Sequence, residues 1–463
     1  MKVYFRECGR IASSLMYYLL IAILIFSWSQ NVQGVTKTEI DRANGTAQID
    51  NGVDRPLLAK PLKTDDFYGT KHEENPEKIM CGMVDTLLRE YRNNSYTTYP
   101  LGYYKSISLD ENEQNRILEI LCEITGLTKS QLDALPEDYF PAINGTIIHP
   151  GGYETDSSGN IIAKNTTNAE NADQSVDKTK HFVSQVSYER FKELLTEVER
   201  ITEGGYYYSL DVLIEYFGLT DMSYDEAMEE YHHTVNDEKI TVPFARLFCD
   251  YMGLALGLYP IFIVVLMWLK DRTSNTIELI YSRKVSSVKL VISRYLASIT
   301  MVLIPVFLLS LESLIPLMSF GAESGISVDC FAYIKYILWW LLPTVMVVSA
   351  IGMFFTLLTD FPIAIVLQFL WWTVDKGMTG LSGDTKITTL MVRHNTLRGY
   401  EIIQEGFEII CMNRLLVAGV SILFVILSVW ILGQKRKGRI NAANIYGKCL
   451  GHIQNKFSVK PTK

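Results

Sequence analysis

Apolar residues along this chain cluster into segments long enough to cross a lipid bilayer, and polar stretches separate them. The hydrocarbon core is about 30 Å thick and needs about 20 helical residues. Helix is expected in each segment because a chain in lipid must satisfy its own backbone hydrogen bonds. We predict six spans, at residues 11–28, 247–269, 290–311, 336–358, 361–374 and 415–432. The fifth is short, so we expect it to be tilted, broken or continued by re-entrant structure.

The polar stretch between the first two spans, residues 30–246, predicts a separate and mainly helical domain. Apolar residues recur at helical spacing over residues 76–91, 108–126, 187–202, 209–216 and 223–232. Ser108, with Glu111 three residues later, has the spacing of a capping box at the start of the second of these helices. Residues 150–180 are rich in Asn, Gly, Ser, Asp and Thr, which predicts an exposed loop.

Charge predicts the orientation of the spans. Residues 31–245 hold 19 Lys and Arg against 38 Asp and Glu, a net charge of −19 within the −8 of the whole chain, so the remainder carries +11. Cytoplasmic loops carry an excess of Lys and Arg. The cations that flank the spans are Lys2, Arg6, Arg10, Lys270, Arg272, Arg283, Lys284, Lys289, Arg294, Lys435, Arg436, Lys437 and Arg439. We therefore expect both termini in the cytoplasm, and the polar domain outside the plasma membrane.

The first apolar segment has two interpretations. It has the basic start of a signal peptide, but its apolar core is longer than usual and no small-x-small cleavage site follows Trp28. We expect an uncleaved anchor. The predicted layout is a cytoplasmic N-terminus (1–10), a first transmembrane helix (11–29), an extracytoplasmic domain (30–246), a second helix (247–269), a cytoplasmic segment (270–289), four further helices with an outer region near 375–413 (290–432) and a basic cytoplasmic tail (433–463).

Residues with an evident chemical role are few. The chain has no HExxH, GxSxG, CxxC or GxxxxGK[ST] pattern, so no zinc protease, serine hydrolase, zinc ribbon or P-loop is indicated. His232 and His233 are adjacent, which places them on different helix faces and favours solvated surface over a metal site. A disulfide between Cys81 and Cys122 stays an open alternative. The basic tail predicts contact with membrane lipids, and no motif in it indicates nucleic-acid binding.

Two polar residues within the predicted spans are candidates for a translocation path. Glu312 lies at the outer end of the third span, and Gln368 lies inside the fifth. Polar and ionisable groups in a membrane are costly and are often functional. Headgroup-level surface is the alternative for Glu312.

The most informative segment lies between the second and third spans. Residues 275–286 read Asn-Thr-Ile-Glu-Leu-Ile-Tyr-Ser-Arg-Lys-Val-Ser, an amphipathic pattern that predicts a short helix at the cytoplasmic membrane surface. The pattern resembles the coupling-helix motif of the ABC type-2 permease family, Gly-Thr-x-Glu-x-Leu-Leu-Ser-x-Pro-Ile/Val-Ser. The resemblance is carried by Thr276, Glu278, Leu279, Val285 and Ser286, whereas Asn275 replaces the glycine and Lys284 the proline.

The resemblance implies the permease subunit of an ABC exporter, without ATPase activity of its own. Such a subunit pairs with a second copy or a related permease and binds a separate ABC ATPase subunit, which holds the ATP and Mg²⁺. No cofactor or metal is implied in this chain. The implied contact residues are Thr276, Ile277, Glu278, Leu279, Ile280 and Arg283.

The predicted fold class is therefore an α-helical membrane protein with six transmembrane helices and a large, mainly helical extracytoplasmic domain inserted after the first. Two rival functions stay open. One is a membrane-anchored receptor whose acidic outer domain binds a ligand, and the other is an intramembrane enzyme, for which we can place no catalytic dyad. The sequence does not indicate the transported substrate.

Overall fold

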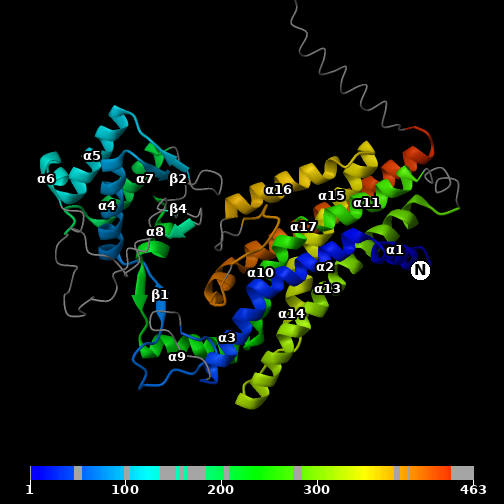
Figure 1. Ribbon diagram of the computed structural model, residues 1–463, viewed down its shortest axis with the longest axis horizontal. Coiled ribbons are helices and arrows are strands. Elements are labelled where there is room, and N and C mark those ends of the chain that lie inside the picture. The colour runs from blue at the N-terminus through cyan, green and yellow to red at the C-terminus, as the bar shows by residue number, and fades with distance from the viewer. Residues whose placement is uncertain are drawn as a thin grey trace, which may run out of the picture. The chain divides into compact units, whose positions relative to one another are not determined.

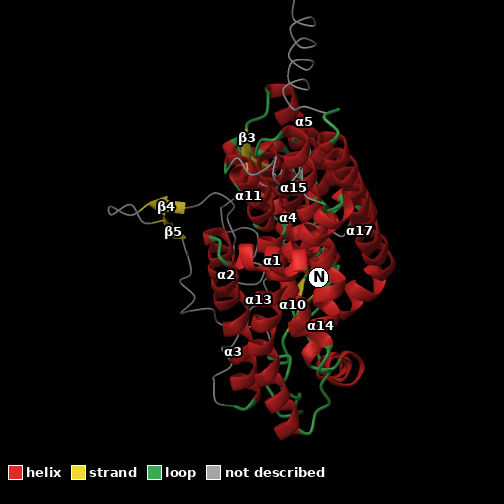
Figure 2. Cartoon of the chain, turned by 90° about the vertical axis from the view of Figure 1, so that its right-hand side faces the viewer, coloured by secondary structure: helices red, strands yellow, loops and turns green. Residues whose placement is uncertain are grey.

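A computed structural model describes residues 2–45, 55–98, 105–135, 153–155, 161–163, 183–202, 208–274, 284–379, 386–394 and 396–439. Helices dominate these residues, and the strands are short (Figure 2). The chain divides into two compact units, each described by itself. We call Met1–Asp50, Pro56–Pro61 and Met228–Lys463 the bundle unit, and Asn51–Arg55 and Leu62–Ala227 the insert unit.

The bundle unit is built from long apolar helices. Five helical stretches are long and apolar enough to cross a membrane, namely Leu15–Ala43, Thr241–Arg272, Ser287–Ser324, Ala332–Thr359 and Tyr400–Arg436, and a shorter apolar helix covers Ile363–Asp375. The helices of the bundle unit are α1 (Lys2–Ala12), α2 (Leu15–Trp28), η1 (Ser29–Gln33), α3 (Gly34–Ala43), η5 (His233–Glu238), α10 (Thr241–Leu256), α11 (Pro260–Thr273), α13 (Ser287–Ser324), α14 (Ala332–Tyr336), η6 (Ile337–Leu341), α15 (Leu342–Thr359), α16 (Ile363–Thr379) and α17 (Tyr400–Arg436). Figure 1 shows α2, α10 and α13 running alongside one another.

The first predicted span begins later and ends later than the sequence suggested. The amphipathic helix α1 stops at Ala12, and α2 starts at Leu15 after Ser14, whose side chain accepts a hydrogen bond from the Tyr17 amide at 3.3 Å. A serine in this position satisfies an amide that the first turn leaves open. Beyond Trp28 the helix continues through the π-helical turn η1 and through α3 to Ala43. The apolar core therefore forms only part of a longer rod.

The second predicted span is interrupted. We expected one helix over residues 247–269, but α10 ends at Leu256 and α11 starts at Pro260. Proline has no amide hydrogen and is favoured in the first turn of a helix, so a new helix starts at Pro260. The third, fourth and sixth spans are longer than predicted, because α13, α15 with its preceding turns, and α17 keep their helical form past their apolar cores.

The insert unit is mainly helical, and all but one of its helices lie close to the ranges predicted from the sequence. The short helix at Lys129–Ala134 was not predicted. The helices of the insert unit are α4 (Pro76–Asn93), α5 (Glu111–Thr125), α6 (Lys129–Ala134), α7 (Tyr188–Ile201) and α8 (Leu210–Phe217), with α9 (Tyr224–His232) crossing into the bundle unit. Three antiparallel pairs of short strands complete it: β1 (Thr70–His72) with β6 (Leu219–Asp221), β2 (Tyr96–Thr98) with β3 (Lys105–Ile107), and β4 (Tyr153–Thr155) with β5 (Ile161–Ala163).

The insert unit has its own hydrophobic core. It is formed by the apolar faces of α4, α5, α7 and α8, with Ile79, Leu87, Ile117, Ile124 and Phe191 each fully buried. The start of α5 corrects a prediction. The capping box is formed by Asp110 and Glu113 rather than by Ser108 and Glu111, so the helix begins at Glu111.

Candidate functional site

The predicted coupling segment lies outside the described residues. Thr276, Ile277, Glu278, Leu279, Ile280 and Arg283 all fall within residues 275–283. The structure describes both flanks of this segment, which are the end of α11 and the start of α13. Ser286 caps α13, since its hydroxyl accepts a hydrogen bond from the Lys289 amide at 3.2 Å.

A buried cluster of charges fixes the end of α11. Asp271 accepts hydrogen bonds from Arg10 of α1 at 2.7 Å and from Arg294 of α13. Arg10 also binds Glu7 at 2.9 Å, and the Arg294 guanidinium lies over the Trp268 ring at 4.4 Å from its centre. The two carboxylates and two guanidiniums balance one another, which is the condition for burying charge at tolerable cost. We call this cluster the first joint.

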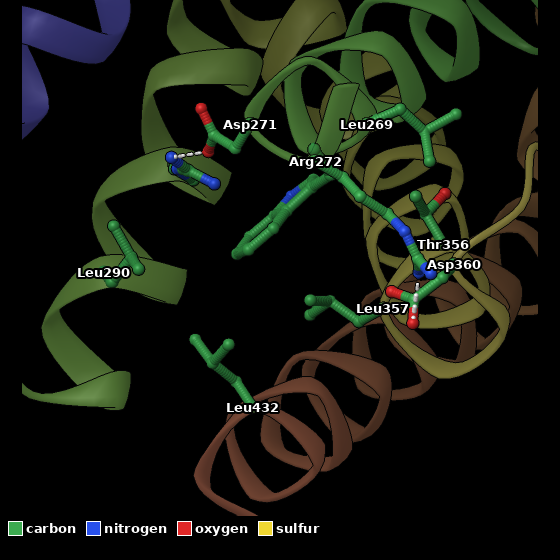
Figure 3. A pocket seen from close by; sticks show the side chains of 10 residues that line it. Leu269, Asp271, Arg272, Leu290, Thr356, Leu357, Asp360 and Leu432 are labelled. Atoms are coloured by element: carbon green, nitrogen blue, oxygen red, sulfur yellow. Dashed lines mark hydrogen bonds and ion pairs between the residues drawn. The ribbon is translucent and has the colours of Figure 1, made fainter. Parts of the chain in front are cut away.

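A second ion-paired cluster lies across a small cavity from the first. Asp360, which caps the end of α15, forms ion pairs with Arg272 at 2.5 Å and with Lys435 of α17 at 2.8 Å. Figure 3 shows Asp271 and Arg272, neighbours in the chain, pointing to different sides, with Arg272 reaching Asp360. The cavity between the two clusters has a volume of only about 20 Å³, enough for about one water molecule. We call this second cluster, formed by Asp360, Arg272 and Lys435, the second joint. The cavity between the two joints has no room for a ligand.

Arg436 adds a contact to the residue that precedes the α13 cap. Its guanidinium donates to the Val285 carbonyl and, at 3.4 Å, to the Ser287 hydroxyl. Together with the two joints, this contact holds both flanks of residues 275–283 against α1, α15 and α17. We call this end of the bundle unit the basic end.

Glu312 lies in a groove. The groove has a volume of about 270 Å³ and is lined by Trp28, Gln33, Thr36, Lys37, Ile40 and Asp41 from the α2–η1–α3 rod and by Glu312, Ser313 and Pro316 from α13. The Trp28 indole donates to the Ser313 hydroxyl at 3.0 Å, which fixes the two walls to each other.

Gln368 lies elsewhere and holds the break in the second span. Its side chain is fully buried, and its amide nitrogen donates to the Gly257 carbonyl at 2.7 Å. Trp372, one turn further along α16, donates to the Leu254 carbonyl at 3.0 Å. These two side chains satisfy carbonyls that lose their helical partners where α10 ends. The structure does not bring Glu312 and Gln368 together, and a translocation role for either stays a prediction.

An extended segment that was not predicted from the sequence lies buried in the bundle unit. Leu390 is fully buried and Thr389, Met391, Val392, Arg393 and His394 are nearly so. Side chains from the surrounding helices satisfy its backbone. Asp375 accepts from the Leu390 amide at 2.7 Å, Asn413 donates to the Thr389 carbonyl at 2.8 Å, and Arg414 donates to both the Thr389 and the Leu390 carbonyl. Buried backbone outside regular secondary structure requires such partners.

His394 ends this segment in an unusual environment. The Asp250 carboxylate accepts a hydrogen bond from the His394 amide at 3.0 Å. Within the described part of the chain, neither nitrogen of the His394 ring has a hydrogen-bond partner. Burial lowers the pKa of His394 to about 4, and the positive charge of Arg246 acts in the same direction. The charged residues Arg246, Asp250, Asp375 and Arg414 were visible in the sequence as interruptions of apolar stretches, which is the signal that would have found the site.

Metal binding finds no support among the described residues, where no group of three His, Cys, Asp or Glu side chains has a suitable arrangement. His233 instead binds Asp237 at 2.6 Å. Cys81 and Cys122 are both free.

The helices define the class of the molecule. It is an α-helical, multi-pass membrane protein with an inserted compact unit. No known protein family, curated protein or solved structure matches the chain.

Proposed function

We propose that this chain is the permease subunit of an ABC exporter in the plasma membrane, with both termini in the cytoplasm and a separate ATPase subunit as its energy source. The observation that carries the proposal is the pair of joints at the basic end. They connect the flanks of residues 275–283, where the sequence resembles a coupling helix, to α1, α13, α15 and α17 through Asp271 and Asp360. A force on that segment would act directly on four helices of the bundle unit.

The same joints support six crossings. Asp360 at the end of α15 and Lys435 at the end of α17 form an ion pair, so both helices end on the same side. The chain between them must therefore return to the opposite side before α17 begins. The short helix α16 is about 25 Å long at 1.5 Å per residue, and it starts this return. Six crossings place both termini on one side, as a permease with a cytoplasmic coupling segment requires.

The test is to isolate the tagged chain from its own cell in mild detergent and to measure ATPase activity in the purified material. We expect a stoichiometric ATPase subunit with the wild-type chain and its loss with Glu278→Arg, because the reversed charge opposes the coupling contact. The matched control is Glu323→Arg, an exposed carboxylate near the far end of α13.

Two outcomes would contradict the proposal. One is a wild-type chain that carries no nucleotide-binding partner, which would favour a receptor with an acidic ligand-binding insert unit. The other is equal loss of the ATPase in the Glu323→Arg variant, which would show that the effect is not specific to the coupling segment.

A further inference from the structure

The groove around Glu312 contains opposite charges on its two walls. Within the described residues, neither the Glu312 carboxylate nor the Lys37 ammonium forms an ion pair. Glu312 comes from α13 and Lys37 from α3, so the two groups line opposite walls. Asp41 is a second carboxylate in the lining, and it has an interaction of its own. An occupant that carries both a cation and an anion, and not an anion alone, complements this lining.

Pro316 adds a further acceptor. Proline has no amide hydrogen, so the main-chain carbonyl four residues earlier, that of Glu312, loses its helical donor. Glu312 therefore supplies both a carboxylate and a carbonyl without its usual partner. Two acceptors at one position favour a primary ammonium group, which donates three hydrogen bonds, over a quaternary ammonium, which donates none.

The groove lies at headgroup depth. Arg10 and Asp271 hold the start of α2 near the basic end, where α13 also starts. From Ser287 to Glu312 the helix rises about 37 Å, and from Leu15 to Lys37 about 33 Å, at 1.5 Å per residue. A hydrocarbon core is about 30 Å thick, so both charges reach the interface opposite the basic end.

An apolar track leads away from the groove along α13. Leu308 and Ile304 lie four and eight residues before Glu312, on the same face of the helix, and are 61% and 42% exposed. A ligand with its polar group at Glu312 would therefore have its hydrocarbon part against this face.

We infer that the groove lined by Trp28, Lys37, Glu312 and Pro316 binds one phospholipid with a primary ammonium headgroup. Glu312 binds the ammonium group of phosphatidylethanolamine, and Lys37 binds its phosphate. An acyl chain of the lipid packs against Leu308 and Ile304. The inference goes beyond the proposed transport role and does not depend on it, because it requires no ATPase.

The test uses the full-length chain, delipidated in detergent and incubated with equimolar phosphatidylethanolamine, phosphatidylcholine and phosphatidylglycerol of identical acyl chains. Native mass spectrometry then counts the retained lipids. We expect phosphatidylethanolamine to be retained about tenfold over each of the others, and Glu312→Gln to remove that preference, since one charge-assisted contact corresponds to about that factor. Lys37→Gln should weaken retention of all three lipids, because each has a phosphate.

The matched control is Glu323→Gln, which removes a carboxylate from the same helix outside the groove and should leave retention unchanged. Thermal unfolding of each variant establishes that it is folded. If Glu312→Gln is unfolded, the Lys37→Gln variant still tests the inference. Equal retention of the three lipids by the wild-type chain, or an equal effect of Glu323→Gln, would overturn the inference. Displacement of the lipid by a soluble amphipathic amine at equal concentration would overturn the lipid as occupant.

Discussion

The buried charge of Arg414 is compensated by neutral acceptors, which are backbone carbonyls and the side chains of Thr344 and Asn413. Arg414 is 3% exposed and donates to the Trp340 carbonyl at 3.0 Å as well as to the carbonyls of the extended segment. An unpaired charge in an apolar interior would cost several kcal/mol, so these bonds are a condition for its presence. The position of Arg414 beside an apolar run could be read from the sequence. Its backbone partners could not, because the carbonyls of Trp340, Thr389 and Leu390 lie 24 or more residues away in the chain.

His394 predicts a pH dependence for the extended segment. Its pKa falls from 6.5 to about 4 on folding, so the folded state binds the proton less readily than the unfolded state. The stability that depends on neutral His394 is complete above pH 6.5 and decreases as the pH falls toward 4. The loss amounts to about 2 kcal/mol at pH 5.

Hydrogen exchange measures this effect at the amides of Leu390, Met391 and His394. We expect their protection, corrected for intrinsic rates, to be lower at pH 5 than at pH 7. His394→Phe should remove the contribution of His394, so that the variant loses less protection than the wild type between pH 7 and pH 5, while it keeps an aromatic ring beside Trp340. His232→Phe is the control, because that imidazole is exposed or nearly so on another element and should leave the profile unchanged. An unchanged profile in the His394 variant would contradict the assignment.

At the scale of elements, helix type and approximate position were predictable, and helix ends were not. The sequence Ser108-Leu109-Asp110-Glu111-Asn112-Glu113 contains two overlapping capping-box spacings. Asn94 decides between them, since its side chain accepts from the Leu109 amide at 2.9 Å and donates to the Leu109 carbonyl at 3.1 Å. These bonds hold Leu109 outside the helix, so Asp110 becomes the cap. A contact between distant residues settled what the local pattern left ambiguous.

The packing of α4 against α8 gives a prediction for Gly82. Alanine is usually better than glycine inside a helix by about 1 kcal/mol. Here, however, a Cβ atom at position 82 would overlap the ring of Phe217, and overpacking typically costs about 1–3 kcal/mol. We expect the steric cost to prevail, so that Gly82→Ala destabilises the insert unit.

Hydrogen exchange of α4 and α8 in the full-length protein checks this result. Gly406→Ala provides the comparison, because a Cβ atom there would meet only the end of the Ile410 side chain at 3.9 Å. That variant should lose no protection. Greater protection of α4 in Gly82→Ala would mean that Phe217 moves aside at little cost.

At the scale of the whole molecule, the sequence predicted a polar domain over residues 30–246, which is wider than the insert unit, and the path of the chain was less predictable. Hydropathy and charge separated the polar insert from the apolar helices, because each unit buries its own core. The fifth span was ambiguous, since its apolar run is short. The ion pair between Asp360 and Lys435 limits the possible paths of the chain between α15 and α17. It joins residues 75 positions apart, and no sequence pattern predicts it.

Three native cysteines test the path directly. Cys8 lies on α1, Cys330 is exposed between α13 and α14, and Cys449 follows α17 in the sequence. Three candidate spans separate Cys8 from Cys330, and an odd number of crossings puts them on opposite sides of the membrane. Variants that keep one of these cysteines, with the others replaced by alanine, are treated with a membrane-impermeant maleimide before and after permeabilisation of the cell.

We expect Cys330 to react in intact cells, and Cys8 and Cys449 to react only after permeabilisation. The last result depends on α16. If α16 and the residues after it complete a crossing, α17 is the sixth span and returns Cys449 to the side of Cys8. If α16 does not cross, five spans leave Cys449 on the side of Cys330, and it reacts in intact cells. That second outcome would conflict with the ion pair between the ends of α15 and α17, because those ends would then lie on opposite sides of the membrane. It would also remove the support that the basic end gives to a cytoplasmic coupling segment.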